Sequence, residues 1–177
     1  MKRWLTSPYA PVIFLMVLAA VLRLLSNELK LWDVTPVTAL ALFGGSMISD
    51  RRLALLMPMT VLLITDAFIG FYDGMWLVYL SFALVVFLGK WIISRPTPVR
   101  IVAASLTAST LFYLITNLAL FYPQTMYPHT WDGIVQSYVA AWPFYRNALF
   151  GDLMYCGIFF GGYVLLQRLA VLFQPKS

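Results

Sequence analysis

Long apolar stretches, divided by prolines, glycines and charged residues, follow one another along almost the whole chain. Hydropathy and these breaks predict six helices, over Tyr9–Leu25, Pro36–Ile48, Leu53–Gly70, Met75–Ile93, Val99–Phe121 and Asn147–Phe173. The second segment is shorter than the roughly 20 residues that a bilayer crossing needs. We therefore expect it to be tilted, or to follow irregular chain over 32–35 that dips below the membrane surface.

The composition indicates that these helices lie in a bilayer. Of the 177 residues, 62% are hydrophobic and only 11% are charged, and the mean hydropathy is +0.83. Soluble domains carry about 25% charged residues, so this chain has too few polar side chains to cover a water-exposed surface. We predict an all-α membrane protein with six transmembrane helices, forming a single integral membrane domain over residues 1–177.

The basic residues are distributed unequally between the two sides that six crossings define. The side opposite the termini carries only Arg23, Lys30 and Arg146, although the chain has 12 basic residues. Positive residues favour the cytoplasmic face, so both termini are predicted in the cytoplasm. The basic residues on the terminal side are Lys2, Arg3, Arg51, Arg52, Lys90, Arg95, Arg100, Arg168 and Lys176.

Acidic residues show the opposite distribution, and we interpret it as functional. Ionisable side chains at membrane depth usually face a bundle interior or a watery cavity. Asp66, Asn117 and Asp152 fall in the outer halves of three predicted helices, which predicts a polar site opening to the outside. As an alternative, Asp66 and Asp152 each form a structural pair with Arg23 or Arg146. The acidic residues on the outer side are Glu28, Asp33, Asp66, Asp73, Asp132 and Asp152.

The longest connection, over 122–146, lies outside and is rich in aromatic residues. We predict a loop, then a short amphipathic helix from Trp131 to about Trp142, which Pro143 ends before the last span. This helix either rests in the aromatic belt of the interface or forms a lid over an external cavity. The candidate substrate-binding residues are Trp32, Asp66, Tyr72, Asn117, Trp131, Trp142, Arg146, Asn147 and Asp152.

Small residues at four-residue spacing indicate close packing between helices. Such spacing lets two helix backbones approach each other. We expect internal packing contacts at the pairs Ala41 and Gly45, Ala104 and Ala108, Ser105 and Ser109, and Gly157 and Gly161. The alternative is that a partner membrane protein docks on one of these surfaces.

The sequence lacks the motifs that several kinds of catalysis, metal binding and nucleic-acid binding require. The chain has no phosphate-binding glycine loop and no His-Glu-x-x-His motif, and its single histidine, His129, lies in the outer loop. The single cysteine, Cys156, is expected to be a small buried residue. No basic and aromatic residues interleave on a soluble surface, as nucleic-acid binding would require. We therefore predict no catalytic residues, cofactor, metal site or nucleic-acid partner.

Four blocks of sequence resemble the substrate-binding S components of energy-coupling factor (ECF) transporters. The closest resemblance is to a bacterial family of small membrane proteins related to that fold, similar also to the solitary vitamin B12 uptake proteins. The blocks are "TPVTALALFGG" at Thr35–Gly45, "LLITDAFIGFYDG" at Leu62–Gly74, "LVYLSFALVVFLG" at Leu77–Gly89 and "MYPHTWDGIVQSYVAAWPFYRNALFGDLMY" at Met126–Tyr155.

The resemblance implies a multi-pass protein of the bacterial cytoplasmic (inner) membrane that binds a small molecule, such as a vitamin or cofactor precursor, near its external face. It also implies docking on a transmembrane coupling protein with two ATPases, although some relatives work alone. Two features depart from the pattern. The first helix lacks a clear Ala-x-x-x-Ala surface, and the third and fourth spans lack the cobalt-binding cysteine of the B12 relatives. His129 would be the remaining candidate for cobalt.

Two other functions stay open at this point. The protein could be a structural or assembly protein whose outer loop binds a partner protein. An enzyme acting on lipid or isoprenoid substrates would need an acid–base pair, for which Asp66 with Asp152 is the sole candidate.

Overall fold

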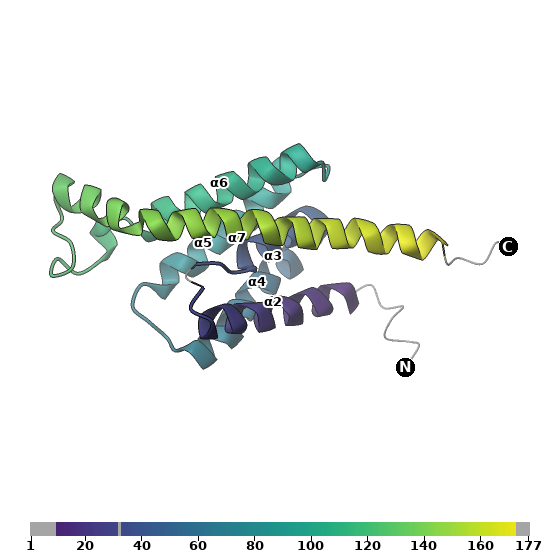
Figure 1. Cartoon of the computed structure of the whole chain (residues 1–177), viewed down its shortest axis with the longest axis horizontal. Helices are drawn as coiled ribbons and strands as arrows, with labels where there is room; N and C mark the ends of the chain where they lie inside the picture. Colours follow the sequence, from purple (N-terminus) through teal and green to yellow (C-terminus); the bar gives the residue numbers. More distant parts are fainter. Residues whose placement is uncertain (1–9, 32, 173–177) are drawn as a thin grey trace.

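The structure, a computed structural model, describes residues 10–31 and 33–172. All regular secondary structure in this part of the chain is helical, as predicted, and each predicted segment falls on an observed helix (Figure 1). The elements are α2 (Ala10–Glu28), α3 (Val37–Met47), α4 (Arg51–Ile69), α5 (Met75–Ile92), α6 (Pro98–Thr116), the short 3₁₀ helix η1 (Ala119–Phe121) and α7 (Trp131–Leu172).

Four of these helices are long and apolar enough to cross a membrane: α4, α5, α6 and the part of α7 over Trp131–Leu165. Their outward surfaces carry large apolar side chains such as Phe68, Phe150 and Trp91, the last of which is 84% exposed. Soluble monomers rarely expose extended apolar surface of this kind. The fold therefore has the character of a membrane protein.

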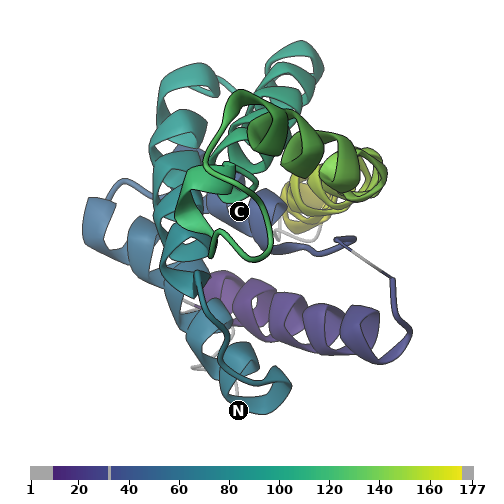
Figure 2. The ribbon, with the colours of Figure 1, turned by 90° about the vertical axis from the view of Figure 1, so that its left-hand side faces the viewer.

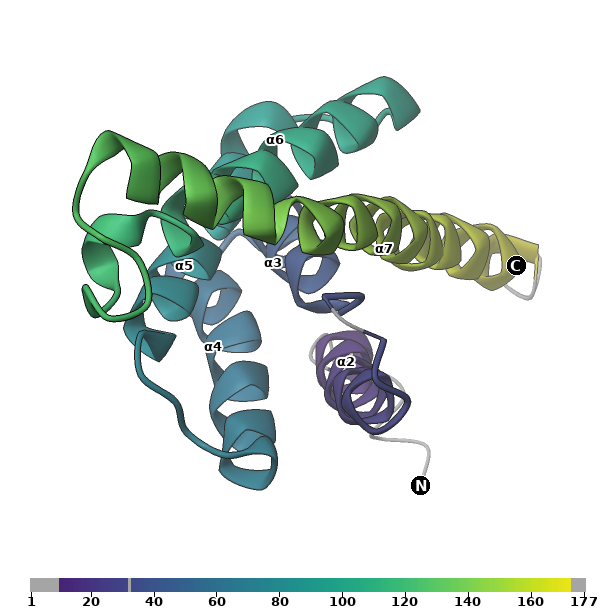
Figure 3. The same ribbon diagram turned by 60° about the vertical axis from the view of Figure 1, so that its left-hand side comes forward.

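Helix α3 forms the centre of the bundle. Every residue from Val37 to Gly45 is buried, and Figure 3 shows α3 enclosed by α2, α4, α5 and α7, all of which contact it. Its 11 residues rise by about 16 Å, roughly half of a hydrocarbon core of about 30 Å. Alone, this helix does not reach across a bilayer, and irregular chain over 29–31 and 33–36 precedes it.

Two glycines allow α3 and α5 to touch through their backbones. A Cβ atom on Gly45 would lie 2.0 Å from the carbonyl oxygen of Val86, and one on Gly89 would lie 2.6 Å from that of Leu42. Both distances are impossible for real atoms, so only glycine permits this contact. The packing role predicted for Gly45 is therefore confirmed.

The other predicted small-residue contacts have different outcomes. Ala104, Ala108, Ser105 and Ser109 are all buried on α6, as expected for a packed face. The prediction for Gly157 and Gly161 is wrong within the described part of the chain, because a Cβ atom on either would meet open space. Spacing alone does not say which face of a helix has a neighbour.

The prediction that Pro143 ends the amphipathic segment is also wrong. Helix α7 continues through this proline from Trp131 to Leu172, over 42 residues. Proline removes one backbone hydrogen bond, and packed membrane helices tolerate this loss. At about 1.5 Å per residue, α7 is roughly 63 Å long, or about twice the hydrocarbon core. Its first turns project past the other helices (Figure 1).

The described residues of three connections, over 29–31 with 33–36, over 70–74 and over 117–130, gather at one end of the bundle, here called the loop end. Figure 1 shows the start of α2 and the end of α7 toward the opposite end, and Figure 2 looks onto the loop end. Gly70 and Gly74 have positive φ angles of 112° and 83°, which glycine adopts without strain. The three connections between successive helices at this end lie close together (Figure 2).

Candidate functional site

A cavity of about 340 Å³, here called the main cavity, opens at the loop end between the α2–α3 connection, α5, α6 and α7. Small-molecule sites typically have volumes of roughly 300–1,000 Å³. Its polar lining comes from Arg23, Asp33, Thr35, Thr38, Ser109, Thr116, Asn117 and Asp152, and its rings from Tyr72, Phe82, Phe112 and Tyr122.

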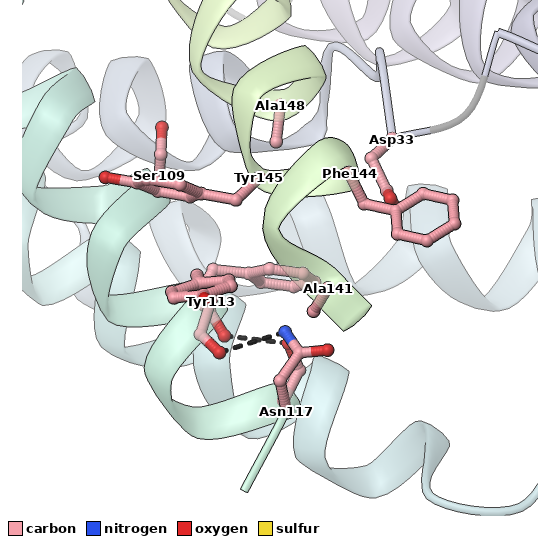
Figure 4. A pocket seen from close by; sticks show the side chains of 10 residues that line it. Asp33, Ser109, Tyr113, Asn117, Ala141, Phe144, Tyr145 and Ala148 are labelled. Carbon is pink, nitrogen blue, oxygen red and sulfur yellow. Dashed lines mark hydrogen bonds between the residues drawn. The ribbon is translucent and has the colours of Figure 1, made fainter. Parts of the chain in front are cut away.

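A second cavity of about 250 Å³ adjoins the main cavity and shares Asp33, Ser109 and Asn117 with it (Figure 4). The rings of Tyr113 and Tyr145 form part of its wall, with their centroids 4.5 Å apart. The space at the loop end is therefore larger than the main cavity alone.

Asp152 is the most buried ionisable residue among those lining the main cavity. It lies on α7, and only 3% of the residue is exposed. The Ser109 hydroxyl on α6 lies 2.6 Å from its Oδ2 atom, and the Thr38 side chain on α3 also interacts with its carboxylate. Within the described chain the one ion pair joins Arg23 to Asp66, so Asp152 has hydroxyl partners but no basic partner.

Asp66 has the opposite arrangement. Its Oδ1 atom lies 2.6 Å from Nη2 of Arg23 on α2, and its Oδ2 atom accepts a hydrogen bond of 2.9 Å from the Tyr79 hydroxyl on α5. Arg23 also donates to the Thr65 hydroxyl. Asp66 is completely buried, while the guanidinium of Arg23 reaches the main cavity. Asp66 therefore forms the structural pair with Arg23 that the sequence analysis gave as an alternative to ligand binding.

The α2–α3 connection covers the main cavity on one side. Asp33 has a positive φ angle of 60°, which aspartate tolerates better than most residues. The next residue, Val34, lies against α7, because a Cβ atom on Gly151 would be 3.0 Å from its Cγ1 atom. Although Asp33 as a whole residue is exposed, loss of water around its carboxyl raises the pKa of that group above its ordinary value.

Hydrogen bonds fasten the start of α7 to the end of α6. The Tyr113 hydroxyl donates to the carbonyl oxygen of Tyr138 over 2.7 Å, and the Tyr138 hydroxyl donates to that of Leu114 over 2.7 Å. The Ser137 hydroxyl donates to the carbonyl oxygen of Asn117 over 2.8 Å. The amide of Asn117 is itself held by a 2.9 Å bond to the Tyr113 carbonyl (Figure 4). These bonds fix one wall of both cavities.

Two tyrosines at the cavity mouth, Tyr72 and Tyr122, are partly desolvated. Tyr122 donates its hydroxyl to the carbonyl oxygen of Thr116. Desolvation raises the pKa of Tyr122, and desolvation together with the charge of Asp66 raises that of Tyr72. Both phenols therefore stay neutral at physiological pH and can donate hydrogen bonds.

The predicted site residues have four different outcomes. Tyr72, Asn117 and Asp152 come together around the main cavity, whereas Asp66 lies behind it. Trp32 lies outside the described residues. Beside the two cavities described above lie two smaller ones, of about 230 and 190 Å³. Four predicted residues are exposed on α7 and line none of these four cavities: Trp131, Trp142, Arg146 and Asn147.

The continuity of α7 explains why those four residues point elsewhere. Residues three and four apart share one face of a helix, and Ala141, Tyr145, Ala148 and Asp152 follow that spacing along the cavities. A break at Pro143 would have allowed the preceding segment to turn separately. Because α7 is one continuous helix, the face on which Asp152 lies also fixes the faces on which the preceding residues lie.

Several cavity residues had no distinguishing signal in the sequence. In sequence, the spacing of Ser109 indicates a packing residue, and Thr38 is one hydroxyl in an apolar helix. Asp33 is one of several acids on the predicted outer side. Their importance depends on the three-dimensional proximity of α3, α6 and α7 around Asp152.

Metal binding finds no support among the described residues, where no three His, Cys, Asp or Glu side chains gather. His129 is exposed, and its Nε2 atom lies 2.9 Å from the carbonyl oxygen of Tyr122. Cys156 is buried in the core, as expected from the sequence.

The chain belongs to a family whose function is not known. Residues 5–174 match the model of the Family of unknown function (DUF6580). No curated protein and no solved structure matches the chain significantly. The family match covers every helix described above and hence both cavities.

Proposed function

We propose that the protein is a substrate-binding membrane protein that captures a small molecule, such as a vitamin or cofactor precursor, at the external face of the bacterial inner membrane. One observation carries the proposal. Tyr72, Asn117 and Asp152, from three separate parts of the chain, line one cavity of ligand size at the loop end. Concave sites with rings and a few converging polar groups are the usual form of small-molecule sites.

In this proposal the six crossings and cytoplasmic termini predicted from the sequence direct the loop end outward. A ligand enters beside the α2–α3 connection and the connection 117–130, which border the main cavity and the cavities next to it. Rearrangement of these connections or of the bundle then opens the site inward, as in other gated proteins. The energy for uptake comes from an ECF-type coupling protein with ATPases, if the chain works as an S component does.

The direct test is to purify the full-length protein in mild detergent and identify co-purified small molecules by mass spectrometry. Calorimetry against a panel of vitamins and nucleobases follows. We expect one compound to bind at about one molecule per chain, and Asp152→Asn to weaken it. Asp132→Asn is the matched control, because Asp132 is an exposed acid on the same helix, outside the cavities. If nothing co-purifies and no compound of the panel binds, the proposal fails.

A second function is favoured by a separate observation. Trp131, Arg146 and Asn147 are exposed on α7 outside the four cavities, where a partner protein could contact them. In this alternative the chain is a structural or assembly protein. Arg146→Ala would then reduce co-purification of a membrane or periplasmic partner and leave small-molecule binding unchanged.

The enzyme alternative has less support. Asp66 is paired with Arg23, and Asp152 with Ser109. The two carboxylates thus have separate partners, instead of forming the acid–base pair that lipid chemistry would require. We therefore assign no catalytic step to this chain.

A further inference from the structure

The charge around the main cavity is not balanced. Arg23 is the one basic residue among those lining it, and its partner Asp66 lies directly behind. These two charges cancel. The carboxylates of Asp33 and Asp152 remain, and both line the cavity.

The burial of Asp152 makes this imbalance significant. A carboxylate that is almost completely buried is costly unless a cation or several hydrogen bonds compensate it. Here the described protein supplies the hydroxyl of Ser109 and an interaction with Thr38, but no lysine or arginine. A cationic group in the cavity would supply the missing charge.

The rings of the cavity favour the same kind of ligand. Phe82 and Phe112 contact each other with centroids 5.1 Å apart, and both line the main cavity together with Tyr72 and Tyr122. Aromatic faces attract cations and give flat contact area to a planar molecule. A flat cation therefore satisfies both the acidic and the aromatic parts of the lining.

We propose that the ligand is a flat organic cation with at least one N–H group, which pairs with Asp152 while its ring contacts the aromatic wall of the main cavity. Asp33 adds a second negative charge on the same cavity. This inference rests on the proposed function and specifies the chemical class of its substrate. A neutral ligand would leave Asp152 without a counter-charge, and an anionic one would be repelled by both free carboxylates.

The test uses three probes of nearly the same shape that differ in charge. Benzamidine is a planar cation at neutral pH, benzamide is neutral, and benzoate is an anion. Each is titrated calorimetrically into the purified full-length protein in detergent. We expect benzamidine to bind at least tenfold more tightly than benzamide, and benzoate to bind most weakly.

Variants connect this preference to Asp152. Asp152→Asn should make benzamidine and benzamide bind equally, whereas the surface control Asp132→Asn should keep the preference. If Asp152→Asn does not fold, Asp33→Asn provides a second measurement, and it should reduce the preference by a smaller factor. An unchanged preference in the variant that is measured overturns the assignment.

The outcomes also separate this inference from the proposed function. If benzamide or benzoate binds as tightly as benzamidine, or benzamidine does not bind, the cation assignment is wrong. A neutral or anionic compound that co-purifies likewise overturns it but leaves small-molecule binding intact. The proposed function itself fails when nothing co-purifies and no member of the panel of vitamins and nucleobases binds.

Discussion

Asp66 and Asp152 are two buried aspartates whose charges are compensated differently. Asp66 has a cation within 2.6 Å and a tyrosine hydroxyl within 2.9 Å. Asp152 has the Ser109 hydroxyl and an interaction with Thr38, but no basic partner in the described chain. In sequence the two residues look alike, since each is one acid in the outer half of an apolar segment.

The difference shows that depth in the membrane does not by itself mark a ligand site. A buried acid whose counter-charge belongs to the protein is a structural tie, because both charges are already compensated. A buried acid that faces a cavity without a counter-charge is available to a ligand. Four predictions test this contrast, and each states how much a substitution should change the free energy of unfolding.

The largest effect is expected from breaking the tie. Arg23→Met leaves the fully buried Asp66 without its cation, and loss of one partner from a buried pair costs about 3–5 kcal/mol. Unfolding in detergent, followed by thermal or denaturant titration, measures the change. The double variant Arg23→Met with Asp66→Leu should recover most of the loss. If the Arg23→Met variant is as stable as the wild type, the pair of Arg23 and Asp66 has no structural role.

An intermediate effect is expected at the hydroxyl partner of Asp152. Ser109→Ala removes the group 2.6 Å from Oδ2, and a buried polar atom that loses its partner costs about 1–3 kcal/mol. Thr107→Ala is the control on the same helix, because its exposed hydroxyl bonds only to the Ala103 carbonyl of its own helix. Equal effects of the two substitutions would show that Ser109 does not support Asp152.

A smaller effect is expected when the charge of Asp152 itself is removed. Asp152→Asn keeps the shape and a hydrogen-bonding side chain, and it removes an uncompensated buried charge, so stability without ligand should change by less than about 1 kcal/mol. Asp66→Asn should be destabilised by roughly 3 kcal/mol, because Arg23 loses its charged partner. The same unfolding measurement compares them. Similar losses in both variants would remove the contrast.

The smallest effects are expected on the exposed side of α7. Trp131→Ala, Arg146→Ala and Asn147→Ala change side chains outside the cavities, and exposed substitutions usually shift stability by less than about 0.5 kcal/mol. Affinity for benzamidine should stay at the wild-type value in calorimetry. A tenfold loss of benzamidine affinity in any of the three variants would show that the substituted residue belongs to the binding site.

Much of the helical arrangement could be predicted from the sequence. Apolar segments of sufficient length form helices in a bilayer because every backbone polar group must then be satisfied within the chain. The predicted positions of α4 and α5 lie close to the observed helices. The continuation of α7 through Pro143 could not be predicted, since a proline can either end or be accommodated in a helix, depending on its neighbours.

For the candidate site, the sequence by itself indicated that Tyr72, Asn117 and Asp152 belong to one polar region, because polar groups in apolar segments must avoid lipid. It also determined the membrane character of the chain through its composition. Only the tertiary structure decided that Arg23 neutralises Asp66 and that Asp152 faces a cavity without such a partner. The physical reason is that electrostatic compensation acts over a few ångströms, and distances between side chains on different helices are set by packing.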